Sequence, residues 1–416
     1  MNVLVIGSGG REHAICWALR KSPRVNKLYC APGNGGISTI AECVDIDAID
    51  IDGLVRFSKE NAIDFVVVAP EDPLSRGLVD TLESAGIRAF GPRKDAAVIE
   101  SSKIFSKNLM KKYNIPTAEY ETFTDADSAK AYIREKGAPI VIKADGLALG
   151  KGVVVAMDLE TALEAVDAMM LDRKFGDGGG RVVIEEYMTG PEVTVLAFTD
   201  GKTIKPMLSS QDHKRAFTGD LGPNTGGMGA FCPSPNYTDD IADVCMNTIF
   251  RPTVDALANE GRTFKGVLYF GLMLTPSGPR VIEYNCRFGD PETQAVLSML
   301  KTDLLDIFEV VVDERLGELD IEWQDGASCC VVMASGGYPE KYDKGFTISG
   351  LDDVPGDITV FHAGTAKSGA DFVTNGGRIL GITATGESLA AAAKRAYEGV
   401  ACINFEKAHY RTDIGV

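Results

Sequence analysis

A chain of 416 residues is too long to fold around one hydrophobic core, so roughly two to four domains are expected. Apolar residues (45%) and charged residues (24%) occur in globular proportions, and no stretch approaches the ~18 uninterrupted apolar residues of a membrane span. The formal net charge of −17 argues against a nucleic-acid partner, because phosphate backbones are bound by basic surfaces. Small phosphorylated ligands are not excluded, since a few local cations and backbone amides can hold them.

The N-terminus and the cysteines indicate a cytoplasmic protein. Residues 1–7 carry no basic leader and enter a strand directly, so no secretory signal is expected. The nine cysteines are odd in number and include no C-x-x-C pair. This usage favours reduced thiols over disulfides or a structural zinc site.

About the first 90 residues alternate strands with helices, which predicts an open parallel α/β sheet. Strands are expected at 2–6, 27–30, 65–69 and 88–90, and helices near 11–21, 52–61 and 73–85. The turn at 7–13 follows a strand and opens a helix, so its backbone N–H groups could face an anion. A dinucleotide would need an acid at the end of the second strand, and residues 29–34 contain none. An NAD-dependent oxidoreductase is therefore disfavoured.

A helix predicted at 103–113 is followed by a compact flap at about 120–189. Its expected parts are strands at 139–143 and 181–186, a helix near 159–170 and a flexible connector at 176–180. Lys143 ends the first of these strands, and a glycine-rich hairpin with Lys151 follows it. The hairpin lacks the G-x-x-x-x-G-K-[ST] pattern, which excludes a Walker site. Its amides would cover a triphosphate while Lys143 meets the α- or β-phosphate; a plain β-hairpin would not explain the two lysines.

The apolar strand at 182–188 enters a turn at 189–192 that could form a slot for adenine. Backbone groups would hydrogen-bond the base edge, and Glu192 could accept from a ribose hydroxyl. An ordinary linker between domains explains these residues nearly as well.

The region at 210–229 is rich in glycine and charge, and is expected to be a loose loop. His213, Lys214 and Arg215 are three consecutive potential cations, and glycines and prolines dominate 219–229. Long loops of this kind inside compact domains are usually functional. Asp212 could orient an amine, while Lys214 and Arg215 could hold a phosphate.

The most informative segment is 283–292, which follows an apolar strand. Glu283 and Asn285 are two apart in an extended chain, so their side chains share one face. A carboxylate and an amide oxygen on one face can hold Mg²⁺, with water and phosphate oxygens completing its shell. Arg287 would offer a planar fork to a phosphate. A merely solvated surface turn is the alternative, and the density of charge beside an apolar strand weighs against it.

These segments resemble a known family when taken together. The flap with Lys143, the hinge strand at 185–188 and the Glu283-x-Asn285 pair resemble ATP-grasp carboxylate–amine ligases in order and spacing. More closely, the segments 7–13, 212–215, 222–229 and 287–292 resemble the phosphoribosylamine–glycine ligase (glycinamide ribonucleotide synthetase) family. The resemblance runs along the whole chain; Cys286 departs from the small residue more often expected there.

The resemblance implies an α/β and α+β multidomain fold. An N-terminal open parallel α/β (pre-ATP-grasp) domain would bind substrate over 1–102. An ATP-grasp domain pair would cover 103–325 and include the flap, expected to be mobile. A C-terminal mixed β/α domain would cover 326–416, with one Ala-rich helix at 388–399; none of its residues is expected to be catalytic.

The implied reaction joins glycine to 5-phosphoribosylamine with ATP, giving glycinamide ribonucleotide, ADP and phosphate. It would pass through glycyl phosphate and belong to de novo purine (IMP) biosynthesis. The implied partners are small molecules and Mg²⁺ or Mn²⁺, with no nucleic acid or membrane, and the protein is expected to be a monomer.

The resemblance also implies a role for each site residue. The catalytic residues would be Arg287, Asp212 and Lys214, and the metal ligands Glu283 and Asn285. ATP would be bound by Lys103, Lys143, Gly150, Lys151, Gly152, Glu185, Glu186, Tyr187, Met188 and Glu192. The other substrates would be bound by Gly9, Gly10, Arg11, Glu12, His13, Asn34, Asp212, His213, Lys214, Arg215, Pro223, Asn224, Thr225, Gly226, Gly227, Met228, Gly229, Asp290, Pro291 and Glu292.

Two other hypotheses remain open. Another ATP-grasp enzyme, either an amine ligase or a carboxylase, would share the nucleotide residues but not the loops at 212–215 and 222–229. A non-catalytic nucleotide-binding regulator would have no need of the Glu283 and Asn285 pair.

Overall fold

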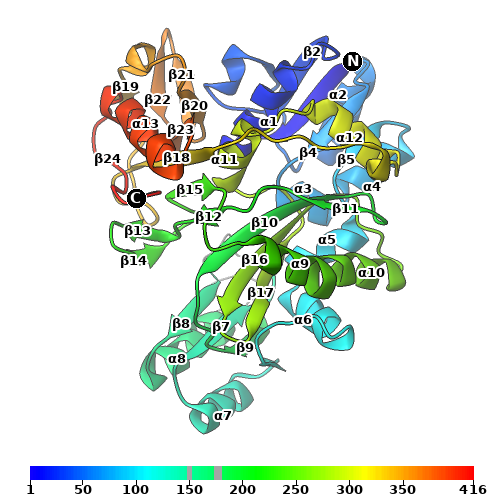
Figure 1. The fold of residues 1–416 in the computed structure, drawn as a ribbon, viewed down its shortest axis with the longest axis vertical. Helices are drawn as coiled ribbons and strands as arrows, with labels where there is room; N and C mark the ends of the chain where they lie inside the picture. The colour runs from blue at the N-terminus through cyan, green and yellow to red at the C-terminus, as the bar shows by residue number, and fades with distance from the viewer. Residues whose placement is uncertain (148–151, 173–179) are drawn as a thin grey trace.

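The computed structural model describes residues 1–147, 152–172 and 180–416. Gly150, Lys151 and positions 176–179 of the predicted connector lie outside the described residues. The N-terminal segment, the C-terminal segment and the flap occupy three corners of the molecule, around a central antiparallel sheet (Figure 1). No helix in the described part of the chain has the length and hydrophobicity needed to cross a bilayer.

The N-terminal segment forms a parallel five-stranded sheet in the order β3-β2-β1-β4-β5. The elements are β1 (Asn2–Gly7), α1 (Gly10–Arg20), β2 (Lys27–Pro32), η1 (Ile37–Thr39), β3 (Glu42–Cys43), α2 (Ile51–Glu60), β4 (Phe65–Val68), α3 (Glu71–Arg76), α4 (Leu78–Ser84), β5 (Arg88–Phe90), α5 (Lys94–Ser101) and α6 (Lys103–Lys112). The prediction of one helix at 73–85 is wrong, because Gly77 has a φ of 87° and separates α3 from α4. The carboxyl ends of β1 and β4 meet at one edge of the sheet, which places their following turns side by side.

The flap is an antiparallel sheet in the order β6-β9-β7-β8. Its elements are β6 (Tyr120–Phe123), α7 (Ala126–Lys136), β7 (Ile140–Ala144), β8 (Val153–Ala156), α8 (Leu159–Val166), the π-helical turn η2 (Asp167–Leu171) and β9 (Val182–Glu186). Asp125 and Asp158 start the two α-helices by accepting from backbone N–H groups of the first turn. The apolar side chains of the flap form a core cluster of their own, so this subdomain is a distinct structural unit.

The central part is an antiparallel sheet in the order β11-β10-β16-β17. Its elements are β10 (Glu192–Thr199), β11 (Ile204–Pro206), α9 (Asp239–Cys245), η4 (Met246–Phe250), α10 (Arg251–Asn259), β16 (Gly266–Thr275), β17 (Gly278–Asn285), α11 (Glu292–Ser298), α12 (Leu304–Val312) and η5 (Leu316–Glu318). One core cluster contains both Leu4 and Val66 of the N-terminal sheet and Val195 and Phe270 of the central sheet. The two sheets are therefore joined by continuous apolar packing.

The C-terminal sheet is built from two distant parts of the chain. It runs β12-β15-β18-β23-β20, with β24 also pairing to β18. From the middle of the chain, β12 (Gln211–Asp212) and β15 (Gly229–Cys232) belong to this sheet, while β13 (Arg215–Phe217) and β14 (Leu221–Asn224) pair with each other as a separate two-stranded sheet. From the end of the chain, it contains β18 (Ala327–Ser335), β20 (Thr359–His362), β23 (Arg378–Gly386) and β24 (Ala408–His409). A separate three-stranded sheet has the order β19 (Thr347–Ile348), β22 (Asp371–Thr374) and β21 (Thr365–Ser368), and η6 (Leu351–Asp353) and α13 (Leu389–Cys402) complete this part.

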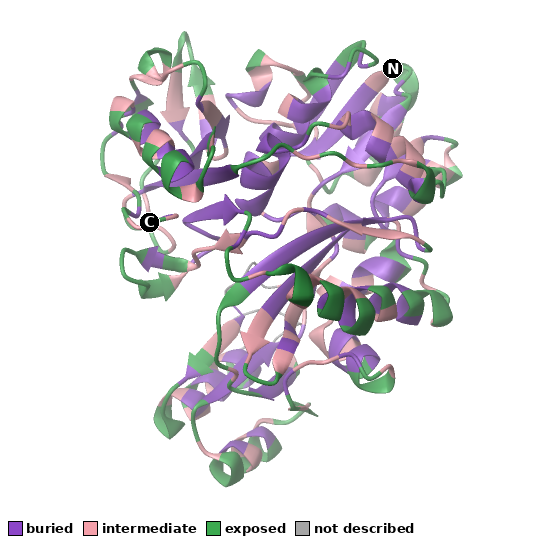
Figure 2. Ribbon diagram, viewed as in Figure 1, coloured by how far each residue is buried: buried purple, intermediate pink, exposed green. Residues whose placement is uncertain are grey.

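This pairing corrects the expectation of a loose loop at 210–229. The segment is ordered because β15 pairs with β18, with Ala230 opposite Cys330. Figure 2 shows that the strands of the inner sheets are buried, whereas α7 and α13 expose one face to solvent. The polar segment 210–229 is thus held by the C-terminal sheet beside the centre of the molecule.

Candidate active site

A cleft of about 820 Å³ is lined by residues of the flap, the central sheet, the N-terminal sheet and the C-terminal sheet. Most of the predicted site residues line it. They are Gly9, Arg11, Glu12, Lys103, Lys143, Gly152, Glu185, Glu186, Tyr187, Met188, Glu192, Asp212, Lys214, Asn224, Thr225, Gly226, Glu283, Asn285, Arg287, Asp290 and Glu292. The fold therefore brings together segments that are separated by more than 200 positions in the sequence.

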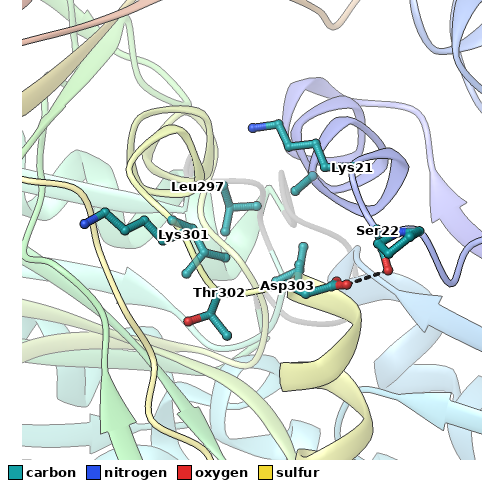
Figure 3. Close-up of a pocket in the computed structure, with 10 residues that line it drawn as sticks. Lys21, Ser22, Leu297, Lys301, Thr302 and Asp303 are labelled. Atoms are coloured by element: carbon teal, nitrogen blue, oxygen red, sulfur yellow. Dashed lines mark hydrogen bonds between the residues drawn. The ribbon is translucent and has the colours of Figure 1, made fainter.

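A second pocket, of about 190 Å³, lies between the end of α1 and the start of α12 (Figure 3). Lys21 and Lys301 flank it. Asp303 already caps α12, since it accepts from Leu305 N at 2.9 Å and from Ser22 Oγ at 2.6 Å. None of the predicted site residues lines this pocket, and the larger cleft is the candidate site.

The last strand of the central sheet, β17, carries the predicted metal ligands. Glu283, Tyr284 and Asn285 all line the cleft, but the Tyr284 side chain packs in the apolar core, where its hydroxyl lies 2.9 Å from Thr253 Oγ1. Burial alone would raise the pKa of Glu283, but the nearby lysines Lys214, Lys143 and Lys103 outweigh it and hold that pKa below its usual value.

These two residues fit a hard divalent cation. An ionised carboxylate and an amide oxygen are ligands that Mg²⁺ accepts, together with water and substrate phosphates. Among the described residues there is no group of three or more His, Cys, Asp or Glu side chains arranged as a metal cage. Glu283 and Asn285 therefore suit a metal ion that takes most of its remaining ligands from water and from the phosphates of a substrate.

Buried lysines gather where the flap meets α6. Lys143 Nζ lies 3.0 Å from Glu185 Oε2 and donates to the carbonyl of Ile282. Lys107, which the sequence did not single out, lies 3.2 Å from the same Glu185 oxygen and donates to Thr117 Oγ1. Burial lowers the pKa of Lys107 to about 8, against the opposing effect of Glu185. The three charged side chains are each 5% exposed or less, so they form a closed array.

Two residues that line this part of the cleft, Glu185 and Lys103, carry polar atoms that are not fully paired among the described residues. Glu185 Oε1 is buried and has no hydrogen-bond partner among the described residues. Lys103 Nζ donates to the carbonyl of Gly146 at 2.9 Å, at the start of the hairpin. The array thus offers an acceptor and cations to a ligand in this part of the cleft.

Residues 212–215 alternate between two sides of an extended segment. Asp212 and Lys214 line the cleft, whereas His213 and Arg215 do not. The His213 ring packs near Phe231, and Arg215 Nη1 donates to the carbonyl of Gly222 in its own hairpin. We therefore drop His213 and Arg215 from the proposed site.

The two side chains that enter the cleft lie among carboxylates. Lys214 Nζ is 3.2 Å from Glu192 Oε2 and 3.8 Å from Glu283 Oε1. Burial raises the pKa of Asp212 to about 7; Lys214 opposes this, and the carboxylates of Glu292, Glu192 and Glu283 reinforce it. Such a carboxyl group exchanges a proton near neutral pH, as a general base requires.

The turn at 7–13 differs from an open anion-binding nest. Its Gly9 N donates to Glu12 Oε2 at 2.6 Å, and its Arg11 N donates to Asp290 Oδ2 at 3.1 Å. At these two amides the acceptor is thus a carboxylate of the protein itself. Direct binding of a substrate phosphate at this turn stays a prediction.

Other predicted residues lie outside the cleft lining and hold domains together. His13 Nδ1 accepts from His362 N at 2.8 Å, and Asn34 Nδ2 donates to the carbonyls of Ser8 and His362. Both contacts join the N-terminal sheet to β20 of the C-terminal sheet. The remaining predicted residues that do not line the cleft are Gly10, Pro223, Gly227, Met228, Gly229 and Pro291.

Arg287 is enclosed by acidic side chains that the sequence did not point to. Its Nε is 3.0 Å from Glu71 Oε2, and its Nη2 is 3.0 Å from Glu100 Oε1 and donates to Asn285 Oδ1 at 3.1 Å. Arg11 Nη2 also contacts Glu71, at 3.2 Å. Arg287 thus orients the predicted metal ligand Asn285.

Glu71 could have been found from the sequence. Burial alone would raise its pKa, but Arg287 and Arg11 outweigh it and hold the pKa of Glu71 far below its usual range. It follows β4 directly, and ligand sites of parallel α/β sheets lie beyond the carboxyl ends of the strands. Tyr338 and Arg378 of the C-terminal domain also line the cleft, and no sequence pattern marked them.

The flap, the central sheet and the cleft with its Glu283 and Asn285 pair define an ATP-grasp enzyme. Family models of phosphoribosylglycinamide synthetase match most of the chain, with the N domain at residues 1–100, the ATP-grasp (A) domain at 101–293 and the C domain at 328–416. The chain belongs to the phosphoribosylglycinamide synthetase family.

Individual relatives cover nearly the full length. The phosphoribosylamine–glycine ligase of Halalkalibacterium halodurans is 52% identical over 100% of this chain and 96% of its own length. That of Brucella melitensis is 50% identical over 100% and 97%. The crystal structure of the Thermotoga maritima phosphoribosylamine–glycine ligase superposes with a TM-score of 0.85 at 32% identity, covering 99% of this chain and 100% of that one.

A more distant likeness concerns the fold alone. The biotin carboxylase domain of Hydrogenobacter thermophilus 2-oxoglutarate carboxylase has a TM-score of 0.77 at 16% identity, covering 98% of this chain and 91% of its own. The ATP-grasp architecture is thus shared well beyond the family.

Proposed function

We propose that this protein joins glycine to 5-phosphoribosylamine at the expense of ATP, giving glycinamide ribonucleotide, ADP and phosphate. This is a step of de novo purine biosynthesis. The observation that carries the proposal is one cleft that holds both the Glu283 and Asn285 pair and the Asp212 and Lys214 pair. Full-length identity of about half to phosphoribosylamine–glycine ligases supports the choice of substrates.

The reaction needs two steps because a carboxylate is a poor acyl donor. An oxygen of the glycine carboxylate attacks the γ-phosphorus of ATP, forming glycyl phosphate and releasing ADP. The amine of phosphoribosylamine then attacks the glycyl carbonyl, the C–O bond to phosphate breaks, and the amine loses a proton. Negative charge grows on phosphoryl oxygens in both steps, so fixed cations matter more than a protein nucleophile.

ATP would lie between the flap and the central sheet. The hinge residues Glu185–Met188 line this end of the cleft, and Glu185 Oε1, which has no hydrogen-bond partner in the described part of the chain, suits an N–H donor of the base. Lys103 and Lys143 would neutralise the triphosphate. Glu192 would accept from the ribose, as its place at the cleft supports.

Glu283 and Asn285 would hold Mg²⁺ or Mn²⁺, which supplies charge neutralisation at the ATP phosphates. Lys214 lies within 4 Å of Glu283 and adds a fixed positive charge beside it. Arg287 keeps Asn285 oriented through its hydrogen bond. These side chains would be set before ATP arrives, so little reorganisation is needed.

Asp212 would accept the proton that the attacking amine loses. Its carboxyl group lines the cleft, and partial burial together with the nearby carboxylates of Glu292, Glu192 and Glu283 raises its pKa to about 7. The flap, with a core of its own, would close over ATP and exclude water from glycyl phosphate. The small-molecule substrates are the only partners that the proposal requires, and a monomer is sufficient for it.

The experiment is ADP release with Mg²⁺-ATP, glycine and freshly prepared phosphoribosylamine, each omitted in turn. The proposal expects strict dependence on all three, and loss of release in Glu283→Ala. Turnover with another acid or amine would move the assignment to a sister ATP-grasp ligase or carboxylase. ATP binding without turnover on any substrate pair would indicate a non-catalytic nucleotide-binding protein.

A further inference from the structure

The C-terminal domain enters the cleft through two side chains. Arg378 is the first residue of β23, and Tyr338 follows β18 in the same sheet. Both line the cleft together with Asn224, Thr225 and Gly226. The chemistry proposed above uses neither side chain.

Arg378 is fixed by backbone acceptors from two segments. Its Nη1 donates to the carbonyls of Gly226 at 2.7 Å, Gly227 at 3.3 Å and Asp290 at 2.6 Å. The same nitrogen is 3.4 Å from Asp290 Oδ1. One guanidinium thus ties the end of the 222–229 segment to the turn that precedes α11.

Tyr338 completes the hold on Gly226. The N–H of Gly226 donates to Tyr338 Oη at 3.0 Å, so both polar groups of this glycine are bound by the C-terminal domain. A Cβ at Gly226 would lie 3.1 Å from Arg378 Cζ. The backbone therefore lies close against the guanidinium, and a side chain at this position would push the guanidinium aside.

The clamped segment in turn fixes Lys214. Thr225 donates to the carbonyl of Lys214 from its N at 2.7 Å and from its Oγ1 at 2.9 Å. Gly227 N donates to Thr225 Oγ1 at 2.9 Å, which orients that hydroxyl. Contacts thus run from Arg378 through Thr225 to the strand that carries Asp212 and Lys214.

The other end of the clamp joins three domains at one carboxylate. Asp290 Oδ2 accepts from Arg11 N at 3.1 Å, and its Oδ1 accepts from Gln294 Nε2 at 3.0 Å. With Arg378, this residue joins the N-terminal, central and C-terminal parts of the fold. Both oxygens are engaged by the protein, so Asp290 serves to place its neighbours, including Glu292.

We propose that Arg378, assisted by Tyr338, is a positioning residue for the acyl-transfer step: it holds the Thr225–Gly226 segment so that Asp212 and Lys214 face the amine. This inference rests on the proposed function and gives the C-terminal domain a part in it. Among the described residues, the hydrogen bonds and ion pairs of Lys143 and Glu185, at the nucleotide end of the cleft, involve neither Arg378 nor Tyr338. The effect of losing Arg378 should therefore be much larger on the amine substrate than on ATP, which the clamp reaches only indirectly, through the contacts of Lys214 with Glu192 and Glu283.

The test uses the full-length variants Arg378→Met, Arg378→Lys and Tyr338→Phe. Arg395→Met is the matched control, because Arg395 is in the same domain and its ion pairs with described residues are those with Asp357 and Glu398 at the surface. Steady-state rates give kcat/KM for phosphoribosylamine, calorimetry gives the Kd of ATP, and a melting curve reports folding.

In Arg378→Met, kcat/KM for phosphoribosylamine should fall by about 100-fold, as for a reacting group displaced by about 1 Å. The Kd of ATP should stay within about twofold. Arg378→Lys should recover part of the rate, since one ammonium can reach some of the carbonyls, and Tyr338→Phe should show a smaller loss with the same pattern. If Arg378→Met does not fold, these two milder variants decide.

An unchanged kcat/KM for phosphoribosylamine in the variants would overturn the inference. Weaker ATP binding together with a lower melting temperature would also overturn it, because this pattern would show that Arg378 makes a merely structural contact. Absence of product in the wild type and in Arg395→Met would overturn the proposed function and this inference with it. If the wild type and Arg395→Met are active and Arg378→Met has the same kcat/KM as they have, the inference is overturned and the proposed function stands.

Discussion

Asp212→Asn should lower activity and raise stability in the same protein. The Asp212 carboxyl lines the cleft among Glu192, Glu283 and Glu292, and burial together with these charges raises its pKa from 3.8 to about 7. Asparagine keeps the shape of the protonated acid and carries no charge. The substitution therefore removes both the proposed base and a source of electrostatic strain.

The magnitude follows from the pKa shift. About 3 units at about 1.4 kcal/mol each give about 4 kcal/mol. The side chain is only partly buried and reaches the cleft, so solvent screening reduces the figure to about 2 kcal/mol. With an unfolding entropy of about 2.1 cal/mol/K per residue over 416 residues, that corresponds to about 2 °C in melting temperature.

The sign depends on pH. The folded protein binds the Asp212 proton more tightly than the unfolded chain does. Below about pH 3.8 the carboxyl group is protonated in both states and does not lower the free energy of unfolding. As pH rises from about 3.8 to about 7, ionisation lowers the free energy of unfolding, and this loss reaches its full size above about pH 7. The stabilisation of Asp212→Asn should accordingly be small at pH 4.5 and full at pH 8. The wild-type rate should rise through about pH 7, and the variant should be slower by about 100-fold or more.

The assay is a melting curve for both proteins at pH 4.5, 6 and 8, beside rates over the same range. Asp320→Asn is the control, since its side chain is fully exposed, and it should change neither quantity. A lower melting temperature in Asp212→Asn at pH 8, or a difference that does not vary with pH, would refute the reasoning. Full activity in the variant would remove Asp212 from the mechanism.

Three further predictions concern the rest of the cleft. Glu185→Gln should lower the free energy of unfolding by about 3–5 kcal/mol in a denaturant titration and weaken ATP binding, because it leaves buried Lys107 and Lys143 without their shared carboxylate. The double variant with Lys107→Met should recover part of the lost stability. An unchanged denaturant titration for Glu185→Gln would contradict this prediction. Chelation of the metal with EDTA should abolish turnover. Glu283→Gln should raise the Mg²⁺ or Mn²⁺ concentration needed for half of the maximal activity by about 10- to 100-fold. The same metal dependence in the variant and the wild type would exclude Glu283 as a metal ligand. Lys214→Ala should lower kcat/KM strongly, while Arg215→Ala, on the opposite face of the strand, should leave kcat/KM within about twofold. Similar losses in both variants would show that the face of the strand on which a side chain lies does not decide whether it belongs to the active site.

The sequence predicted those site residues whose placement in the cleft follows from the spacing of neighbouring residues along one strand. Glu283 and Asn285 share a face because strand periodicity is two, and Lys143 ends an apolar strand before a glycine-rich hairpin. The same rule, applied to residues 212–215, would have separated Asp212 and Lys214 from His213 and Arg215. Treating that segment as a loose loop concealed the alternation.

What the sequence by itself indicated is the strands β1, β2, β4 and β5 of the parallel N-terminal sheet, the strands β7 and β9 of the flap and the charged residue types that line the cleft. Helix and strand periods, glycine turns and residue types are local properties. Tertiary structure decided which groups pair. Arg287 meets Glu71 and Glu100, Glu185 bridges two lysines, and Arg378 closes on Gly226 from 152 positions away. Such contacts depend on strands such as β15 and β18 finding each other across about a hundred residues. That pairing is selected by burial of the whole sheet, and no short pattern encodes it.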